Sequence, residues 1–343
     1  MNLYKYILVR GLGALFVFML ANFIYKATFY KSDIAQHADV LENLWSVPEA
    51  SEAIYFGESS NLYKTNPWAN EPKISQIIDS LLPELNVGTV DNSGLHSGTY
   101  LALIKNIPSN SEVHTLIITM NIRSFGATWR YAIGENYLAK TEEMLASRPA
   151  IINKFIVSLK EYDYKPDSSR TKQMLSAYRT EKFEIPNFKY NNIHDWDSAM
   201  AWGEWKDANP HLYKENLPLA ASYIKNYAFS IDTLTNERLY DFDQIMNEAD
   251  ARDYKVVFNI LDFNHEEGFK LVGPELKYLT DQTRDFLINR YEKRGALMVN
   301  NLYSISDSCF TDRVWPTEHY SLAGKEKVAN KVAREMNKMG WNK

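Results

Sequence analysis

The chain has 343 residues, 45% of them hydrophobic, so it can bury a substantial core in one large domain or two. Its net charge of −5 and the lack of a basic cluster exclude nucleic acid as an expected partner. A single cysteine, Cys309, excludes an intrachain disulfide and a metal site made of cysteine thiolates alone.

The first predicted element is an apolar run from Tyr6 to Tyr25 that only Arg10 interrupts. Twenty helical residues span about 30 Å, the thickness of a bilayer core. A signal peptide has the same basic start and apolar run, but no small-residue cleavage site follows here. The pattern therefore favours an uncleaved membrane anchor over residues 1–30, and the balanced flanking lysines leave its orientation open.

Residues 31–50 predict a stalk helix, with Ser32 as a candidate N-cap and Pro48 near the end. From residue 51 to 343 the pattern changes to short apolar runs rich in β-branched and aromatic residues. These predict strands at 53–57, 86–90, 114–122, 254–263 and 296–305. Amphipathic helical stretches lie between the runs, and this alternation predicts an α/β fold, a three-layer α/β/α sandwich with a mainly parallel sheet.

Residues 136–245 break the alternation and predict a helical insertion or lid between the third and fourth strands. The middle of this segment carries Trp196, Trp202 and Trp205. The tryptophans either attach the insertion to the core or offer flat faces on which sugar rings or an acyl chain could stack. Trp202 and Trp205 are the candidates for substrate contact.

Polar residues follow the first three predicted strands and precede the last helix. Ser59 ends the first strand in "FGESS", Gly98 follows the second in "GLHSGTY", and Asn121 follows the third in "TMNIRS". His319 lies in "HYSLAGKEKVA", just before the final helix. Because parallel strands end at one edge of a sheet, we expect these residues to meet there. A serine nucleophile needs a base and oxyanion donors, which His319, the Ser59 and Gly98 N–H groups and the Asn121 amide would supply.

This order of motifs resembles the SGNH or GDSL hydrolase superfamily over residues 51–135 and 246–340. The resemblance implies that Ser59 is the nucleophile, with Glu58 in place of the usual aspartate, and that His319 is the base. It also implies an oxyanion hole made of Ser59, Gly98 and Asn121.

Two positions depart from the family pattern. Pro316 stands where the family usually has an aspartate, three residues before the histidine. Either Asp312 or Glu318 is left to orient His319, unless the site works as a Ser-His pair. The third motif is also unusual, and Arg123 within it is either a structural residue or a ligand for an anionic or carbonyl group of the substrate.

Membrane-tethered members of the superfamily act in O-acetylation of the cell envelope and in alanylation of teichoic acids, usually beside a multi-spanning acyltransferase. The resemblance thus implies a membrane-anchored esterase or O-acyltransferase in the periplasm or outside the cell, with a carbohydrate or acyl-ester substrate. No metal or cofactor is expected. One alternative is a non-catalytic carbohydrate-binding or assembly protein, favoured by the missing aspartate. Another is a lipase, which would need an apolar cleft beneath the insertion.

Overall fold

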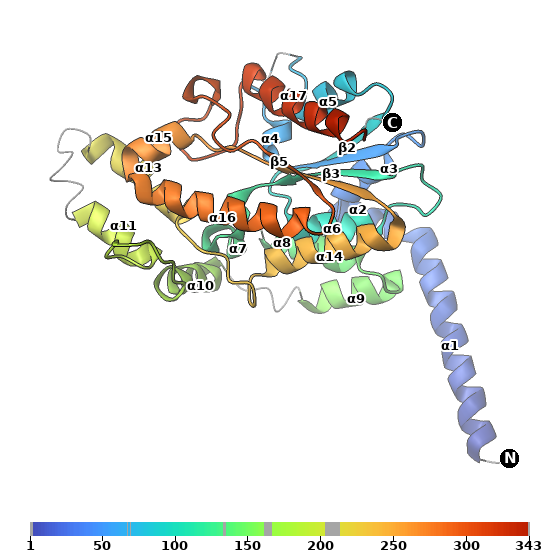
Figure 1. The fold of residues 1–343 in the computed structure, drawn as a ribbon. Coiled ribbons are helices and arrows are strands. Elements are labelled where there is room, and N and C mark those ends of the chain that lie inside the picture. Colours follow the sequence, from blue (N-terminus) through green and yellow to red (C-terminus); the bar gives the residue numbers. More distant parts are fainter. Residues whose placement is uncertain are drawn as a thin grey trace.

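A computed structural model describes residues 3–66, 68, 70–132, 135–160, 167–202 and 213–341. Its centre is a sheet of five parallel strands in the order β2-β1-β3-β4-β5 (Figure 1). The strands are β1 (Ala53–Gly57), β2 (Val87–Asp91), β3 (Thr115–Met120), β4 (Lys255–Ile260) and β5 (Leu297–Asn300). The predicted α/β class and the parallel sheet are confirmed.

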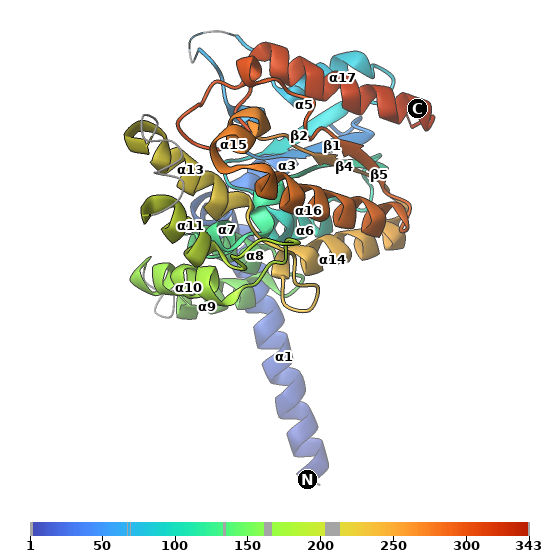
Figure 2. The same cartoon turned by 60° about the vertical axis from the view of Figure 1, so that its left-hand side comes forward.

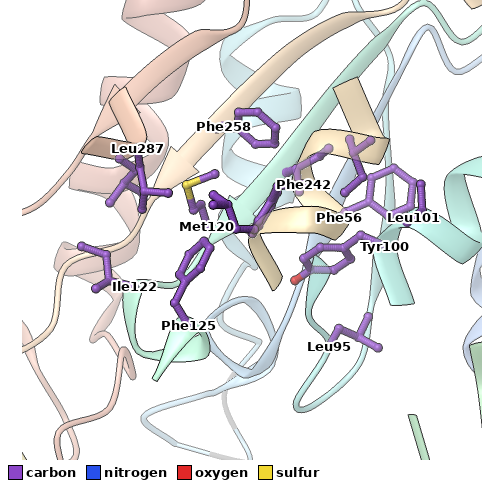
Figure 3. Packing of buried hydrophobic residues seen from close by; sticks show 14 of the residues in the cluster. Phe56, Leu95, Tyr100, Leu101, Met120, Ile122, Phe125, Phe242, Phe258 and Leu287 are labelled. Atoms are coloured by element: carbon purple, nitrogen blue, oxygen red, sulfur yellow. The ribbon is translucent and has the colours of Figure 1, made fainter. Parts of the chain in front are cut away.

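Helices cover both faces of this sheet because successive strand residues point to opposite sides. In β1, Tyr55 belongs to one buried cluster and Phe56 to the other. The Tyr55 side is covered by α5 (Ile74–Leu81) and α17 (Leu322–Lys338), which pack together. The Phe56 side is covered by the three helices α6 (Ser97–Lys105), α14 (Glu237–Arg252) and α16 (Pro274–Glu292) (Figures 1 and 2). Figure 3 shows the aromatic packing on this second side, around Phe56, Phe242 and Phe258.

The N-terminal helix α1 (Leu3–Thr28) leaves the rest of the molecule (Figures 1 and 2). It is long and apolar enough to cross a membrane. The next segment, expected as a stalk, forms α2 (Tyr30–His37) and α3 (Val40–Trp45). Ile34, Leu41 and Leu44 of these helices are buried in the Phe56-side cluster, so the segment is packed into the domain and does not form a separate stalk.

Between β3 and β4 most of the described residues are helical. The elements before α14 are η1 (Ile122–Phe125), α7 (Ala127–Arg130), α8 (Glu135–Leu145), α9 (Ala150–Lys160), α10 (Asp167–Thr180), α11 (Ile193–Trp202) and α13 (Tyr213–Tyr227). The expected end of the insertion at residue 245 falls inside α14, whose Phe242 and Ile245 belong to the core over the sheet. The insertion therefore ends before α14, because this helix is a layer of the fold.

The aromatic residues of the insertion are placed as follows. Trp196 is buried and packs against Phe183 and Phe188, so it holds the insertion together. Trp202 is the last residue of α11, and its side chain is outside the described part of the chain. Trp205 lies outside the described residues altogether.

The strand register brings the carboxyl ends of the strands to one edge. Gly57 pairs with Asp91, and Ile260 pairs with both Met120 and Asn300. The edge carries α4 (Ser59–Leu62), the loop before α6, η1, α15 (His265–Val272) and η2 (Asp307–Cys309). Because β1 lies between β2 and β3, the direction of the crossovers reverses at β1, which is where open parallel sheets bind ligands.

Candidate active site

Ser59 is the first residue of α4 and directly follows the turn at the end of β1. Glu58 is the N-cap of this short helix, and its carboxyl accepts the Ser60 N–H at 3.3 Å and the Ser59 hydroxyl at 2.7 Å. The buried Asn61 amide donates to Asp91 at the end of β2, over 2.6 Å. These bonds hold a strand-to-helix turn that presents the Ser59 hydroxyl at the sheet edge.

His319 reaches Ser59 from the loop before α17, with 3.4 Å between His319 Nε2 and Ser59 Oγ. Its ring stacks on Tyr63, with the centroids 4.4 Å apart and 7° between the planes. Burial lowers the pKa of His319, and the positive charge of Arg123 lowers it further. The neutral imidazole, which can accept a proton, is therefore favoured at this position.

The loop that carries His319 folds back on itself. Phe310 and Tyr320 form an antiparallel bridge, and the His319 carbonyl accepts the Thr311 N–H at 3.0 Å. This pairing brings Asp312, the residue after Thr311, close to the His319 ring, with 3.7 Å between Asp312 Oδ2 and His319 Nδ1. The separation exceeds a hydrogen bond, and Nδ1 bonds to no residue that the structure describes. Asp312 is thus a charge partner of the ring without a direct hydrogen bond to it.

Glu318, the other candidate acid, is committed to a buried network. Its carboxyl accepts the Tyr227 hydroxyl at 2.8 Å and lies 2.5 Å from the Arg123 guanidinium. Burial raises the pKa of Glu318 to about 7, while Arg123 and Tyr227 oppose this rise. Both partners also donate to the Pro316 carbonyl, at 3.4 and 3.2 Å. These bonds therefore fix the loop before His319, and the Glu318 carboxyl is one of the groups that make them.

Arg123 was expected as either a structural residue or a substrate ligand. Its side chain is almost fully buried, is bound to Glu318 and Pro316, and lies 4.3 Å over the Trp129 ring. Burial lowers the pKa of Arg123, but the combined effect of Glu318, Tyr227 and Glu58 raises it above the ordinary value. The guanidinium therefore stays charged and is mainly a structural cation, although it also borders the cavity described below.

The expected oxyanion donors are not all at the site. The Gly98 N–H donates to His96 Nδ1 at 3.2 Å, and a Cβ on Gly98 would meet Glu142 at 2.4 Å. Gly98 is not among the described residues that border the space around Ser59. Gly94, with a φ of +75°, borders it instead. The structure thus places Gly94, and not Gly98, at the border of this space, because the Gly98 N–H is bonded to His96.

Asn121 is the third expected donor. It caps η1, since its side-chain oxygen accepts the Arg123 N–H at 3.2 Å. Its side chain also hydrogen-bonds Glu318, which helps to hold the pKa of that carboxyl down. Asn121 still borders a small chamber of about 30 Å³, together with Gly94 and with Glu58, the residue before Ser59. The chamber is the polar recess of the site.

A cavity of about 830 Å³ opens over Ser59 and His319. Trp129 and Trp315 form part of its wall, and α13 contributes Pro218 and Ala221. These two tryptophans are aromatic wall residues that sequence reasoning missed. The side chains of Trp202 and Trp205, the expected contacts, lie outside the described residues. The sequence feature that could have identified the two wall tryptophans is their position along the chain. Trp129 follows the Asn121 motif closely, and Trp315 precedes the His319 motif.

Among the described residues, no group of three or more His, Cys, Asp or Glu side chains could hold a metal ion. No protein-family model and no curated protein matches the chain. The functional assignment therefore depends on the geometry around Ser59 and His319.

Proposed function

We propose that this protein is a membrane-anchored serine acyl hydrolase or O-acyltransferase, similar to the SGNH superfamily, acting on ester-linked acyl groups of cell-envelope carbohydrate. The observation that carries the proposal is the 3.4 Å approach of His319 Nε2 to Ser59 Oγ. This pair lies beside β1, where the crossovers of the parallel sheet reverse. The three-layer sandwich of the superfamily is consistent with helices on both faces.

The proposed reaction begins from the resting hydrogen bond between Ser59 and Glu58. Rotation about the Cβ–Oγ bond turns the hydroxyl hydrogen to His319, which takes the proton as Ser59 Oγ attacks the ester carbonyl. Negative charge then develops on the carbonyl oxygen, and we assign it to the chamber that Gly94 and Asn121 border. His319 returns the proton to the leaving alcohol. The acyl-enzyme passes its acyl group to water or to a sugar hydroxyl, whose proton goes to His319 and from there to the departing Ser59 oxygen.

The surroundings of the pair support the proposed substrate and location. Trp129 and Trp315 provide flat faces of the kind on which sugar rings pack. The length and apolarity of α1 support a single-pass anchor. We place the catalytic domain in the periplasm or outside the cell, and we propose a multi-spanning acyltransferase in the same membrane as the source of the acyl group.

A second candidate function is a non-catalytic carbohydrate-binding or assembly protein on the same fold. The observation that favours it is the 3.7 Å between Asp312 and His319, which leaves Nδ1 without a hydrogen-bonded carboxylate in the described part of the chain. We rank it second because catalytic hydrogen bonds are often long before substrate binds.

Labelling with a fluorophosphonate probe separates the two functions. We expect the probe to modify Ser59, and Ser59→Ala to reduce hydrolysis of a small acetyl ester by on the order of 10⁴-fold. Ser60→Ala is the matched control, since the Ser60 hydroxyl is buried and bonds to no described residue. It should keep both labelling and activity. An unlabelled wild type that binds carbohydrate but has no esterase activity would favour the second function.

A further inference from the structure

Helix α9 carries large apolar side chains on its outer surface, next to α1. Phe155 is 62% exposed and Leu159 is 53% exposed. Residues four apart lie on the same helix face, so these two side chains form one patch. The opposite face of α9 is inserted in the domain, where Val157 is fully buried. The helix therefore has an outer apolar face that no described part of the chain covers.

The contact between α1 and α9 sets the level of this face along the proposed membrane span. The Ile151 N–H, in the first turn of α9, donates to Asn22 Oδ1 of α1 at 3.1 Å. Asn22 is nineteen residues after Leu3, which corresponds to about 28 Å of helix. A bilayer core is about 30 Å thick. If α1 enters the membrane at Leu3, it leaves the hydrocarbon close to Asn22, where α9 begins.

Helix α9 is also fixed to the domain. Lys154 forms an ion pair with Asp33 of α2 at 2.8 Å. Asn153 donates to the carbonyls of Met144 and Ala146 at the end of α8. Figures 1 and 2 show α9 on the side of the domain from which α1 leaves. A contact between α9 and a membrane would therefore hold the whole domain in one orientation.

We propose that α9 is an interfacial helix that lies in the headgroup region of the membrane entered by α1, with Phe155 and Leu159 at the acyl boundary. An exposed apolar patch beside a membrane span has a lipid surface as its nearest apolar environment. The proposal rests on the membrane anchor under Proposed function, but it does not depend on the acyl-transfer chemistry. Its consequence is a fixed height and tilt of the Ser59 cavity above the membrane.

Site-directed fluorescence tests the proposal on the full chain. Cys309→Ala removes the single cysteine, and Phe155→Cys or Leu159→Cys then adds one attachment point for an environment-sensitive NBD label. Met339→Cys is the matched control, since Met339 is 54% exposed and follows α17 on the other side of the sheet. The proteins are reconstituted in vesicles of phosphatidylethanolamine and phosphatidylglycerol. Flotation with the vesicles establishes the anchor before any fluorescence is measured.

We expect blue-shifted emission from the labels at 155 and 159, and several-fold stronger quenching there than at 339 by lipids spin-labelled near the headgroup. The proposal is overturned if the labels at 155 and 159 show the same emission wavelength and the same quenching by lipid as the label at 339. A second result would also overturn the proposal: labels at 155 and 159 that an aqueous quencher does not reach and that the spin-labelled lipids do not quench. A second protein copy would then cover α9. Hydrolysis of a soluble acetyl ester reports on the Ser59 site separately, so each proposal can fail without the other.

Discussion

Replacing Asp312 by asparagine should reduce turnover far more than stability. Asp312 faces His319 Nδ1 across 3.7 Å, and this charge would stabilise the imidazolium that forms when Ser59 loses its proton. Opposite charges about 4 Å apart interact by about 4 kcal/mol at an effective dielectric constant of about 20. The two side chains are 21% and 19% exposed, so water screens part of this energy. With about 1.4 kcal/mol for each factor of ten, we expect kcat to fall by on the order of 10² to 10³-fold.

Glu318→Gln is the matched comparison for Asp312→Asn. Glu318 is 2% exposed and presents both carboxyl oxygens to the donors of Tyr227 and Arg123. Glutamine replaces one of these oxygens by a donor NH2 group, so it should lower the free energy of unfolding by about 3 kcal/mol. Asp312→Asn should change that free energy by less than about 1 kcal/mol, because Asp312 is partly solvated. Urea denaturation and acetyl-ester turnover measure the two effects. Should Glu318→Gln abolish turnover at unchanged stability while Asp312→Asn stays active, the two roles are reversed.

Three further predictions concern the same loop. Tyr227→Phe removes the hydroxyl that bonds Glu318, and it should lower the free energy of unfolding, measured by urea denaturation, by about 2 kcal/mol. An unchanged free energy would show that the network does not hold the loop. Because the pKa of His319 is lowered, the acidic limb of kcat/KM against pH should have its midpoint below the ordinary histidine value of about 6.5, and a higher midpoint contradicts the assigned environment. Folding raises the pKa of Glu318 from 4.5 to about 7, so its stabilisation is complete below pH 4.5 and is lost as the pH rises through about 7. The unfolding free energy of the wild type should fall relative to that of Glu318→Gln across this window, and parallel pH curves would refute the shift.

The α/β class, the approximate positions of the five strands and the apolar N-terminal helix could be predicted from the sequence alone. Strands of a parallel sheet are buried on both faces, so they appear as short apolar runs. Their ends are less well defined, since the runs predicted at 254–263 and 296–305 extend past β4 and β5, which end at Ile260 and Asn300. The sequence also predicted that Ser59, Asn121 and His319 would lie at one edge, because parallel strands share their carboxyl ends. The computed structure brings these residues to that edge.

Local patterns did not determine which partner each of these side chains meets. The motif favours Gly98, but hydrogen bonding to His96 turns this residue inward and leaves Gly94 at the site. The sequence leaves both Asp312 and Glu318 open as the acid, and the antiparallel bridge in the loop and the buried Arg123 separate them.

The helical pattern of residues 31–50 likewise indicates a helix but does not show what the helix packs against. In the structure, Ile34 and Leu44 of this segment are buried in the core. Tryptophans from distant parts of the chain, Trp129 and Trp315, meet at one cavity. Such contacts join residues far apart along the chain, so they depend on how the layers pack. Periodicity is a property of residues that are near one another in the chain, so the layers of the fold can be predicted from it. The partners of each side chain at the site come from distant segments and follow only from how the layers pack.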